Sequence, residues 1–342
     1  MLKIKKLLTF LIKWILISTS TVVLIVFIYF DYKEIPIYDF KLAYKFIKGE
    51  QNYIQYKNIA QKLGYNKEDK LLIIHADDVG LSSSVNRASF KALKEGSVNS
   101  ASIMMTCEKI SEVSEFSKKN PDFDFGIHLT TTSEWKYYKW DGVLESIKIP
   151  SLINKNGNLH ENIKLVTLKA DPKELKKELQ AQIDLAKSME INISHIDSHE
   201  GALFFNTEFF KVYLELAKEN RLAVFVPSLV TAQFDKNYKQ PDNLVVIDNL
   251  YMAENGMNIN DFENFYIDIL NDLKPGLSQI LVHLGYDNEE MKKITIDHPN
   301  FGSKWRSVDL NVVSSDKFKN TLIKNNIKLV NWKEIQSVLY PN

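Results

Sequence analysis

Cysteine is nearly absent from this chain of 342 residues, which contains only Cys107. A disulfide within the chain and a cysteine-rich zinc site are both excluded, so any metal ion must be held by histidine, aspartate or glutamate. An excess of charge of one sign is also absent, because 43 lysines and arginines balance 43 aspartates and glutamates. This balance argues against a protein that binds nucleic acid through a strongly basic surface, and we expect no nucleic-acid partner.

The sequence also lacks internal repeats and low-complexity segments. Apolar residues make up 45% of the chain and charged residues 25%, which is ordinary globular composition and excludes wholesale disorder. The length admits one large domain or two smaller ones.

A long uncharged run lies near the N-terminus, from Trp14 to Phe30, and four lysines precede it. Its 17 positions span roughly 26 Å as a helix, slightly less than a hydrocarbon core of ~30 Å, and the apolar residues before Lys13 extend it. No cleavage site of small residues follows the run, and no nearby cysteine could carry a lipid. We predict a cytosolic basic segment (1–13), a single transmembrane signal anchor (14–30) and a catalytic domain on the non-cytoplasmic side of the membrane. A cleaved signal peptide is the alternative.

The pattern of apolar and polar residues changes near Lys70. Residues 31–68 are polar and aromatic without a strand pattern, which indicates a stalk with a short helix. From there on, short apolar runs alternate with amphipathic segments, which predicts parallel βα units and an α/β fold, either a barrel or a doubly wound sheet, over residues 69–342. The expected strands are 71–76, 100–105, 123–129, 193–197, 223–226, 244–247, 279–283 and 328–330.

Two adjacent acids, Asp77 and Asp78, follow the first expected strand. The carboxyl end of a strand is where βα barrels build their active sites. Adjacent side chains point to opposite faces of a regular strand, so the pair can share a pocket only if the chain turns, and Gly80 permits such a turn. The alternative is a loop whose acids cap the next helix.

Histidines end three of the later strands. His128 faces away from the apolar side of its strand, and His283 ends another strand just before Gly285. His195, Asp197 and His199 alternate, so they share one face of a strand. Three such groups on a buried face are hard to satisfy without a metal or a substrate, although a structural hydrogen-bond network is the alternative.

Taken together, the carboxylates and imidazoles emerge at the same ends of four strands and describe one site. Two histidines and one aspartate would leave positions open on a divalent ion, the arrangement that metal-assisted hydrolysis requires.

Four segments, LLIIHADDVG, FGIHLT, HIDSHEG and ILVHLGY, closely resemble the YdjC-like (ChbG/HpnK) carbohydrate deacetylases in order and spacing. The similarity extends from about Leu71 to Leu339. It implies a NodB-like deformed (β/α) barrel that uses a divalent metal to remove acetyl groups from N-acetylated sugars. The expected substrate is therefore an acetylated carbohydrate.

The resemblance also implies roles for individual residues. The metal ligands would be Asp78, His128 and His199, with Asp77 as general base and His283 as general acid. We expect His195 or Asp197 to orient a ligand imidazole from the side of the ring that faces away from the metal. Family members are described with Mg²⁺, whereas nitrogen and oxygen ligation favours Zn²⁺, so the sequence leaves the metal open.

The chain departs from the family pattern at several positions. Glu200 and Gly201 follow His199 where many relatives have further histidines, and His75 stands where relatives often have asparagine. A distal loop supplies the expected substrate contacts, namely His298, Trp305 and Arg306, although a packed loop is the alternative.

The leading prediction is a membrane-tethered, metal-dependent deacetylase. A non-catalytic sugar-binding barrel and a metal-dependent esterase or phosphoesterase are the alternatives. The sequence does not specify the oligomeric state, and a homodimer is compatible with it.

Overall fold

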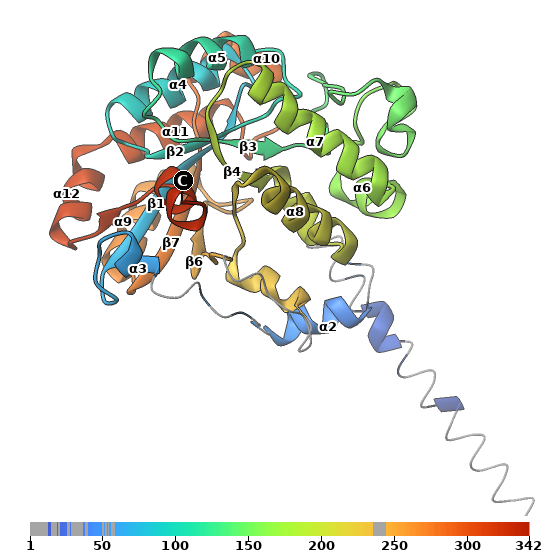
Figure 1. The fold of residues 1–342 in the computed structure, drawn as a ribbon, viewed down its shortest axis with the longest axis horizontal. Helices are drawn as coiled ribbons and strands as arrows, with labels where there is room; N and C mark the ends of the chain where they lie inside the picture. The colour runs from blue at the N-terminus through green and yellow to red at the C-terminus, as the bar shows by residue number, and fades with distance from the viewer. Residues whose placement is uncertain are drawn as a thin grey trace, which may run out of the picture.

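The computed structural model describes residues 13, 14, 19, 21–25, 28, 37, 40–49, 51, 53, 55, 59–234 and 244–341. Its centre is an eight-stranded sheet in the order β5-β4-β3-β2-β1-β7-β6, with β8 paired to β1 (Figure 1). The strands are β1 (Lys70–Val79), β2 (Ser100–Ile103), β3 (Phe125–Leu129), β4 (Ile193–Ser198), β5 (Ala223–Val224), β6 (Asn249–Tyr251), β7 (Gly276–His283) and β8 (Lys328–Leu329).

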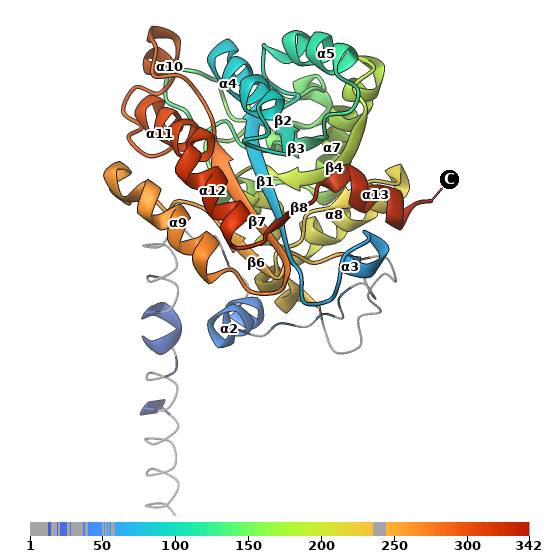
Figure 2. The same ribbon diagram turned by 90° about the vertical axis from the view of Figure 1, so that its left-hand side faces the viewer.

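Every strand pair in this sheet is parallel. β1 lies between β2 and β7 (Figure 2), and all its residues after Lys70 are buried. This explains its continuous apolar run, since parallel strands are covered on both faces. The predicted α/β architecture of parallel strands is confirmed.

The sheet curves into an incompletely closed barrel. β5 and β6 are the two edge strands of the sheet. The segment after β5 and the segment before β6 are joined by one isolated parallel bridge, between Pro227 and Ile247. Ile247 donates its backbone N–H to Val226 and accepts one from Ser228. That this barrel is of the NodB type stays a prediction.

Helices surround the strands on the outside (Figures 1 and 2). Capping residues mark their starts: the Ser82 side chain accepts from the Val85 N–H, and Asp171 caps a helix that begins with Pro172. The helices are α2 (Phe40–Lys48), α3 (Ile59–Lys62), α4 (Ser83–Lys94), α5 (Ile110–Lys119), α6 (Ile163–Lys169), α7 (Pro172–Ser188), α8 (Thr207–Asn220), α9 (Phe262–Asp272), α10 (Glu289–Ile294), α11 (Ser303–Ser314), α12 (Asp316–Lys324) and α13 (Trp332–Leu339).

Part of the predicted stalk packs against the barrel. Leu42 and Ala43 of α2 are buried in a small apolar cluster that Phe205 joins. Farther along, the Tyr53 hydroxyl donates to Asp248 Oδ1 at 2.8 Å. The boundaries of the predicted segments 1–13, 14–30, 31–68 and 69–342 stay predictions.

The prediction of a membrane-spanning anchor requires a correction. Crossing a bilayer takes a continuous apolar helix of about 20 residues. Within the described part of the chain, no helix combines that length with that apolar character. The predicted single-pass membrane protein with an external catalytic domain is therefore wrong. Residues 1–12, and residues 15–18, 20, 26, 27, 29 and 30 of the predicted anchor, lie outside the described residues.

Candidate active site

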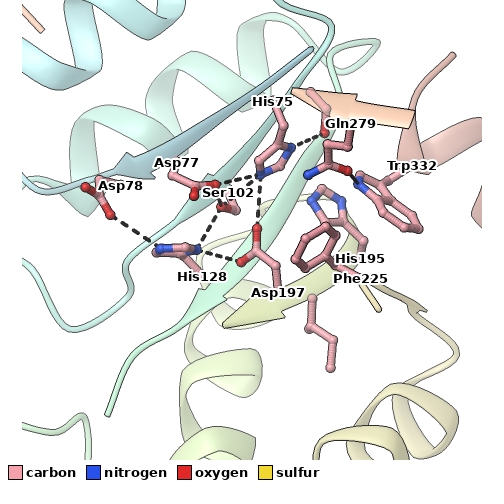
Figure 3. Close-up of polar contacts among 12 residues, drawn as sticks. His75, Asp77, Asp78, Ser102, His128, His195, Asp197, Phe225, Gln279 and Trp332 are labelled. Carbon is pink, nitrogen blue, oxygen red and sulfur yellow. Dashed lines mark hydrogen bonds and ion pairs between the residues drawn. The ribbon is translucent and has the colours of Figure 1, made fainter. Parts of the chain in front are cut away.

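The carboxyl ends of four strands bring the predicted functional residues together. Backbone register places Asp77 beside His283 on β1 and β7, and His128 beside Asp197 on β3 and β4. His199 follows β4 directly, at the start of a 3₁₀ segment. Figure 3 shows the two aspartates of β1 facing the His128 ring. The predicted convergence of these strand ends on one site is therefore what the geometry shows.

The chain turns at the end of β1, and this turn lets both aspartates face the pocket. Asp78 has a φ of 64° and Gly80 a φ of 98°, both in the left-handed region. The pairing register between β1 and β2 shifts between Ala76 and Val79, as in a β-bulge. A side chain at Gly80 would also meet the Met104 carbonyl at 3.2 Å, so glycine is needed there for both reasons.

Asp78, His128 and His199 form a group that fits a divalent metal ion. Asp78 Oδ1 lies 3.4 Å from His128 Nε2 and 3.4 Å from His199 Nδ1. This oxygen is buried and has no hydrogen-bond partner among the described residues. A buried carboxylate oxygen without a hydrogen bond needs positive charge nearby, which either a bound cation or the two imidazoles in their protonated form would supply. One oxygen and two nitrogen donors suit such a cation and leave further positions open.

The second polar atom of each of these three residues is held by a charged neighbour. The pairs are Asp78 Oδ2–Arg306 Nη2 at 2.6 Å, His128 Nδ1–Asp197 Oδ1 at 2.7 Å and His199 Nε2–Glu134 Oε2 at 3.2 Å. A carboxylate behind a ligand imidazole fixes the ring and leaves the opposite nitrogen free for the metal. Asp197 lies against His128 Nδ1, and its role in orienting a metal ligand stays a prediction.

Glu134, the carboxylate in contact with His199, is a residue that the sequence analysis missed. It lies in the loop after β3, six positions beyond His128, and its side chain is 18% exposed. The sequence feature that could have indicated it is an acid in the polar loop that follows the strand of His128. Ser102 was missed as well; its hydroxyl lies 3.1 Å from His128 Nδ1 and 3.1 Å from His75 Nε2.

Replacing Glu134 by glutamine is expected to weaken metal binding about 10- to 100-fold, the usual cost of losing such an outer partner. The amide keeps the size of the side chain but loses the negative charge behind His199. Competition with a chromophoric chelator measures the affinity. Glu145→Gln, which removes an exposed acid paired with Lys148, is the control. Equal affinities in the two variants would contradict the role of Glu134.

The carboxylates around His128 and His199 favour the protonated form of both imidazoles. Burial acts to lower the pKa of His128, but the carboxylates of Asp197 and Asp77 outweigh it and raise the pKa to about 10. At His199, burial also acts to lower the pKa, but Glu134 and Asp78 raise the pKa well above its usual value. The pKa of Asp78 is lowered well below its usual value, against the effect of burial, because Arg306 and the two imidazoles stabilise its charge.

Metal binding should therefore release protons, since only neutral imidazole ligates a metal. Both folded-state pKa values are raised, so the protons are bound at pH 7 and are lost as the pH rises. We expect affinity for Zn²⁺ to increase with pH through the neutral range. Calorimetric titration at pH 7 in two buffers of different ionisation enthalpy measures the released protons. Identical heats in both buffers would show that no proton is displaced.

Asp77 and His283 lie side by side at the edge of the same site. Asp77 Oδ2 is 3.9 Å from His283 Nε2, and Asp77 Oδ1 is 3.2 Å from His75 Nε2. Burial, together with the nearby Arg306 guanidinium, lowers the pKa of His283 to about 4, although the carboxylates of Asp78 and Asp77 act to raise it. His283 is thus neutral at pH 7 and must gain a proton before it can donate one.

His75 and His195 lie deeper in the barrel (Figure 3). His75 Nε2 is 3.0 Å from Asp197 Oδ2; although burial opposes its charge, Asp197 and Asp77 raise the pKa of His75 to about 9. His195 is fully buried, and its ring stacks on Trp332 with a centroid distance of 5.5 Å. The structure thus places Asp197 against a metal-ligand candidate, whereas His195 packs one layer below.

The predicted substrate contacts do not all lie in a loop: Trp305 and Arg306 belong to the first turn of α11, and His298 lies in the segment before it. Trp305 is 1% exposed and packs against Phe262 and Phe301, so no face of its ring is open to a sugar in this state. His298 stacks on Trp135 with a centroid distance of 5.5 Å. Arg306, also 1% exposed, faces Asp78.

Comparison with known proteins identifies the family. A carbohydrate deacetylase of Thermoanaerobacter pseudethanolicus is 26% identical over 263 residues, which are 77% of this chain and 98% of that protein. A chitooligosaccharide deacetylase of Yersinia enterocolitica is 41% identical over 64 residues, 19% of this chain and 25% of that one. A solved structure, a putative cellobiose-phosphate cleavage protein of Enterococcus faecalis V583, has the same fold, with a TM-score of 0.65 and 20% identity over 78% of this chain and 99% of its own. The family model described as YdjC-like protein matches residues 71–324, so the chain belongs to the YdjC-like family.

Proposed function

We propose that this protein is a metal-dependent hydrolase that removes N-acetyl groups from an acetylated carbohydrate. The observation that carries the proposal is Asp78 Oδ1, a buried oxygen without a hydrogen-bond partner among the described residues, 3.4 Å from a nitrogen of His128 and of His199. The substrate class rests on the relatives that are named carbohydrate deacetylase and chitooligosaccharide deacetylase.

The proposed reaction converts an acetamide and water into acetate and an amine. A divalent ion held by Asp78, His128 and His199 would supply Lewis acidity toward the acetyl carbonyl and toward the attacking water. Asp77, the base in this proposal, takes a proton from that water. His283, neutral at pH 7 and 3.9 Å from Asp77, receives this proton and delivers it to the departing nitrogen.

The donor set supports a metal of the Zn²⁺ type over Mg²⁺. Two of the three candidate ligand atoms are imidazole nitrogens, each backed by a carboxylate. Mg²⁺ is usually held by carboxylates, water and phosphate oxygens, whereas Zn²⁺ accepts imidazole readily.

Acetate release from N-acetylated oligosaccharides tests the proposed function. The metal-loaded full chain should deacetylate members of a panel of chitooligosaccharides and peptidoglycan fragments, and chelation should abolish that activity. An O-acetyl ester panel and a phosphoester panel, assayed in parallel, distinguish the esterase and phosphoesterase alternatives. Metal-loaded protein that binds these sugars without cleaving any of them would instead favour a sugar-binding barrel.

A further inference from the structure

We propose that Arg306 is a positioning residue that restricts Asp78 to binding the metal through one oxygen. The second carboxylate oxygen is thereby withheld, and one more coordination position stays open for water or for the acetyl oxygen. The inference rests on the metal site of the proposed function.

The two oxygens of the Asp78 carboxylate have different surroundings. Oδ2 accepts a hydrogen bond from Arg306 Nη2 at 2.6 Å, a short charge-assisted contact. Oδ1 faces His128 and His199, and no donor among the described residues bonds to it. Asp78 is 3% exposed and Arg306 is 1% exposed, so water hardly screens the ion pair. The carboxylate is thus divided between a permanent cation on one side and the metal position on the other.

The Arg306 side chain is held in place from several directions. Its Nε donates to the Phe301 carbonyl at 2.7 Å, and its guanidinium lies 5.4 Å from the centroid of the Trp135 ring. Gly285 packs against its aliphatic stem, and a Cβ added at that glycine would lie 3.1 Å from Arg306 Cβ. These contacts are additional to the bond from Nη2 to Asp78, so the position of the guanidinium does not depend on that bond alone.

Two consequences follow for a bound cation. A carboxylate with both oxygens free can chelate and fill two positions, whereas catalytic metals need positions left open for water and substrate. The positive charge of Arg306 next to Asp78 also opposes a second cation, so the arginine lowers metal affinity. Ordinary structural support for a metal ligand has the opposite effect, because losing it weakens metal binding.

The sign of the affinity change therefore tests the inference, with Co²⁺ as the spectroscopic probe in the full chain. Arg306→Gln should bind Co²⁺ about tenfold more tightly, the lower end of the range for outer-partner effects. Its visible Co²⁺ bands should lose intensity as a second Asp78 oxygen enters the coordination sphere. Arg306→Lys retains the positive charge and should keep an affinity close to that of the parent. Arg87→Ala, which removes an exposed arginine that bonds to the Ser83 carbonyl, is the control and should change neither quantity.

Weaker Co²⁺ binding by Arg306→Gln, with unchanged bands, would overturn the inference and leave the proposed function intact. A parent protein that takes up no Co²⁺ would overturn both. If Arg306→Gln does not fold, infrared spectroscopy of the parent protein provides the test. The difference spectrum between its metal-free and Co²⁺-loaded forms should show a carboxylate bound through one oxygen. A carboxylate bound through both oxygens would overturn the inference.

Discussion

Asp77→Asn is expected to lower kcat for acetate release by about 10²–10⁴-fold, the usual contribution of a positioned acid–base group. The asparagine keeps the size of the side chain and its place between His75 and His283, but it cannot accept a proton from the attacking water. Metal content should stay close to that of the parent, because Asp77 is not among the three candidate ligands. Steady-state kinetics on an N-acetylated oligosaccharide and elemental analysis of the same sample measure the two quantities.

A matched control for this variant is Asp184→Asn. Asp184 lies on α7, outside the site, where its carboxylate accepts from Gln180 at 2.8 Å. Unchanged kcat in Asp77→Asn would remove the base from the proposed reaction. Loss of the metal together with the activity would show instead that Asp77 acts as a ligand.

His199→Ala should abolish stoichiometric metal binding and, with it, detectable deacetylation. The substitution removes one of two imidazole donors and leaves Glu134 without its partner beside Asp78. Truncating one member of a buried charged pair typically costs about 3–5 kcal/mol, so some loss of thermal stability is expected as well. Elemental analysis after dialysis against Zn²⁺ gives the metal content, and circular dichroism confirms that the barrel has formed.

His160→Ala is the control for the metal ligand. His160 is another buried histidine, but its Nε2 contacts the Ser151 carbonyl at 3.0 Å rather than the candidate metal site. It should retain a full complement of metal. Equal metal content in the His199 variant and the parent would show that the ligand assignment is wrong.

The parallel sheet was largely predictable because buried parallel strands leave long apolar runs in the sequence. The runs at 71–76 and 193–197 correspond to β1 and β4. The run at 244–247 was the exception: it is buried, but it pairs only through the Ile247 bridge, and the strand proper, β6, begins at Asn249. An apolar run predicts that a segment is buried. Whether the segment also forms a strand depends on where the two edges of the barrel meet.

The site was predictable where its residues lie on strands or directly at strand ends, and not where they come from a loop or a helix packed over those ends. Parity and strand ends predicted that His128, Asp197 and His283 would converge. Glu134 depends on how the loop after β3 folds, and the orientation of Arg306 depends on how α11 packs over the strand ends, neither of which a periodic pattern encodes. The side chain of Trp305 illustrates the limit: a tryptophan in a distal loop suggested a sugar platform, and the structure buries it in a layer of aromatic rings.

The backbone ladder between β1 and β7 makes Asp77 and His283 direct partners, as the ladder between β3 and β4 does for His128 and Asp197. Interstrand spacing, about 4.8 Å in any sheet, therefore fixes these separations, and the packing of the outer layer does not. Mutations can accumulate in the surrounding helices over evolutionary time without dispersing the reactive groups.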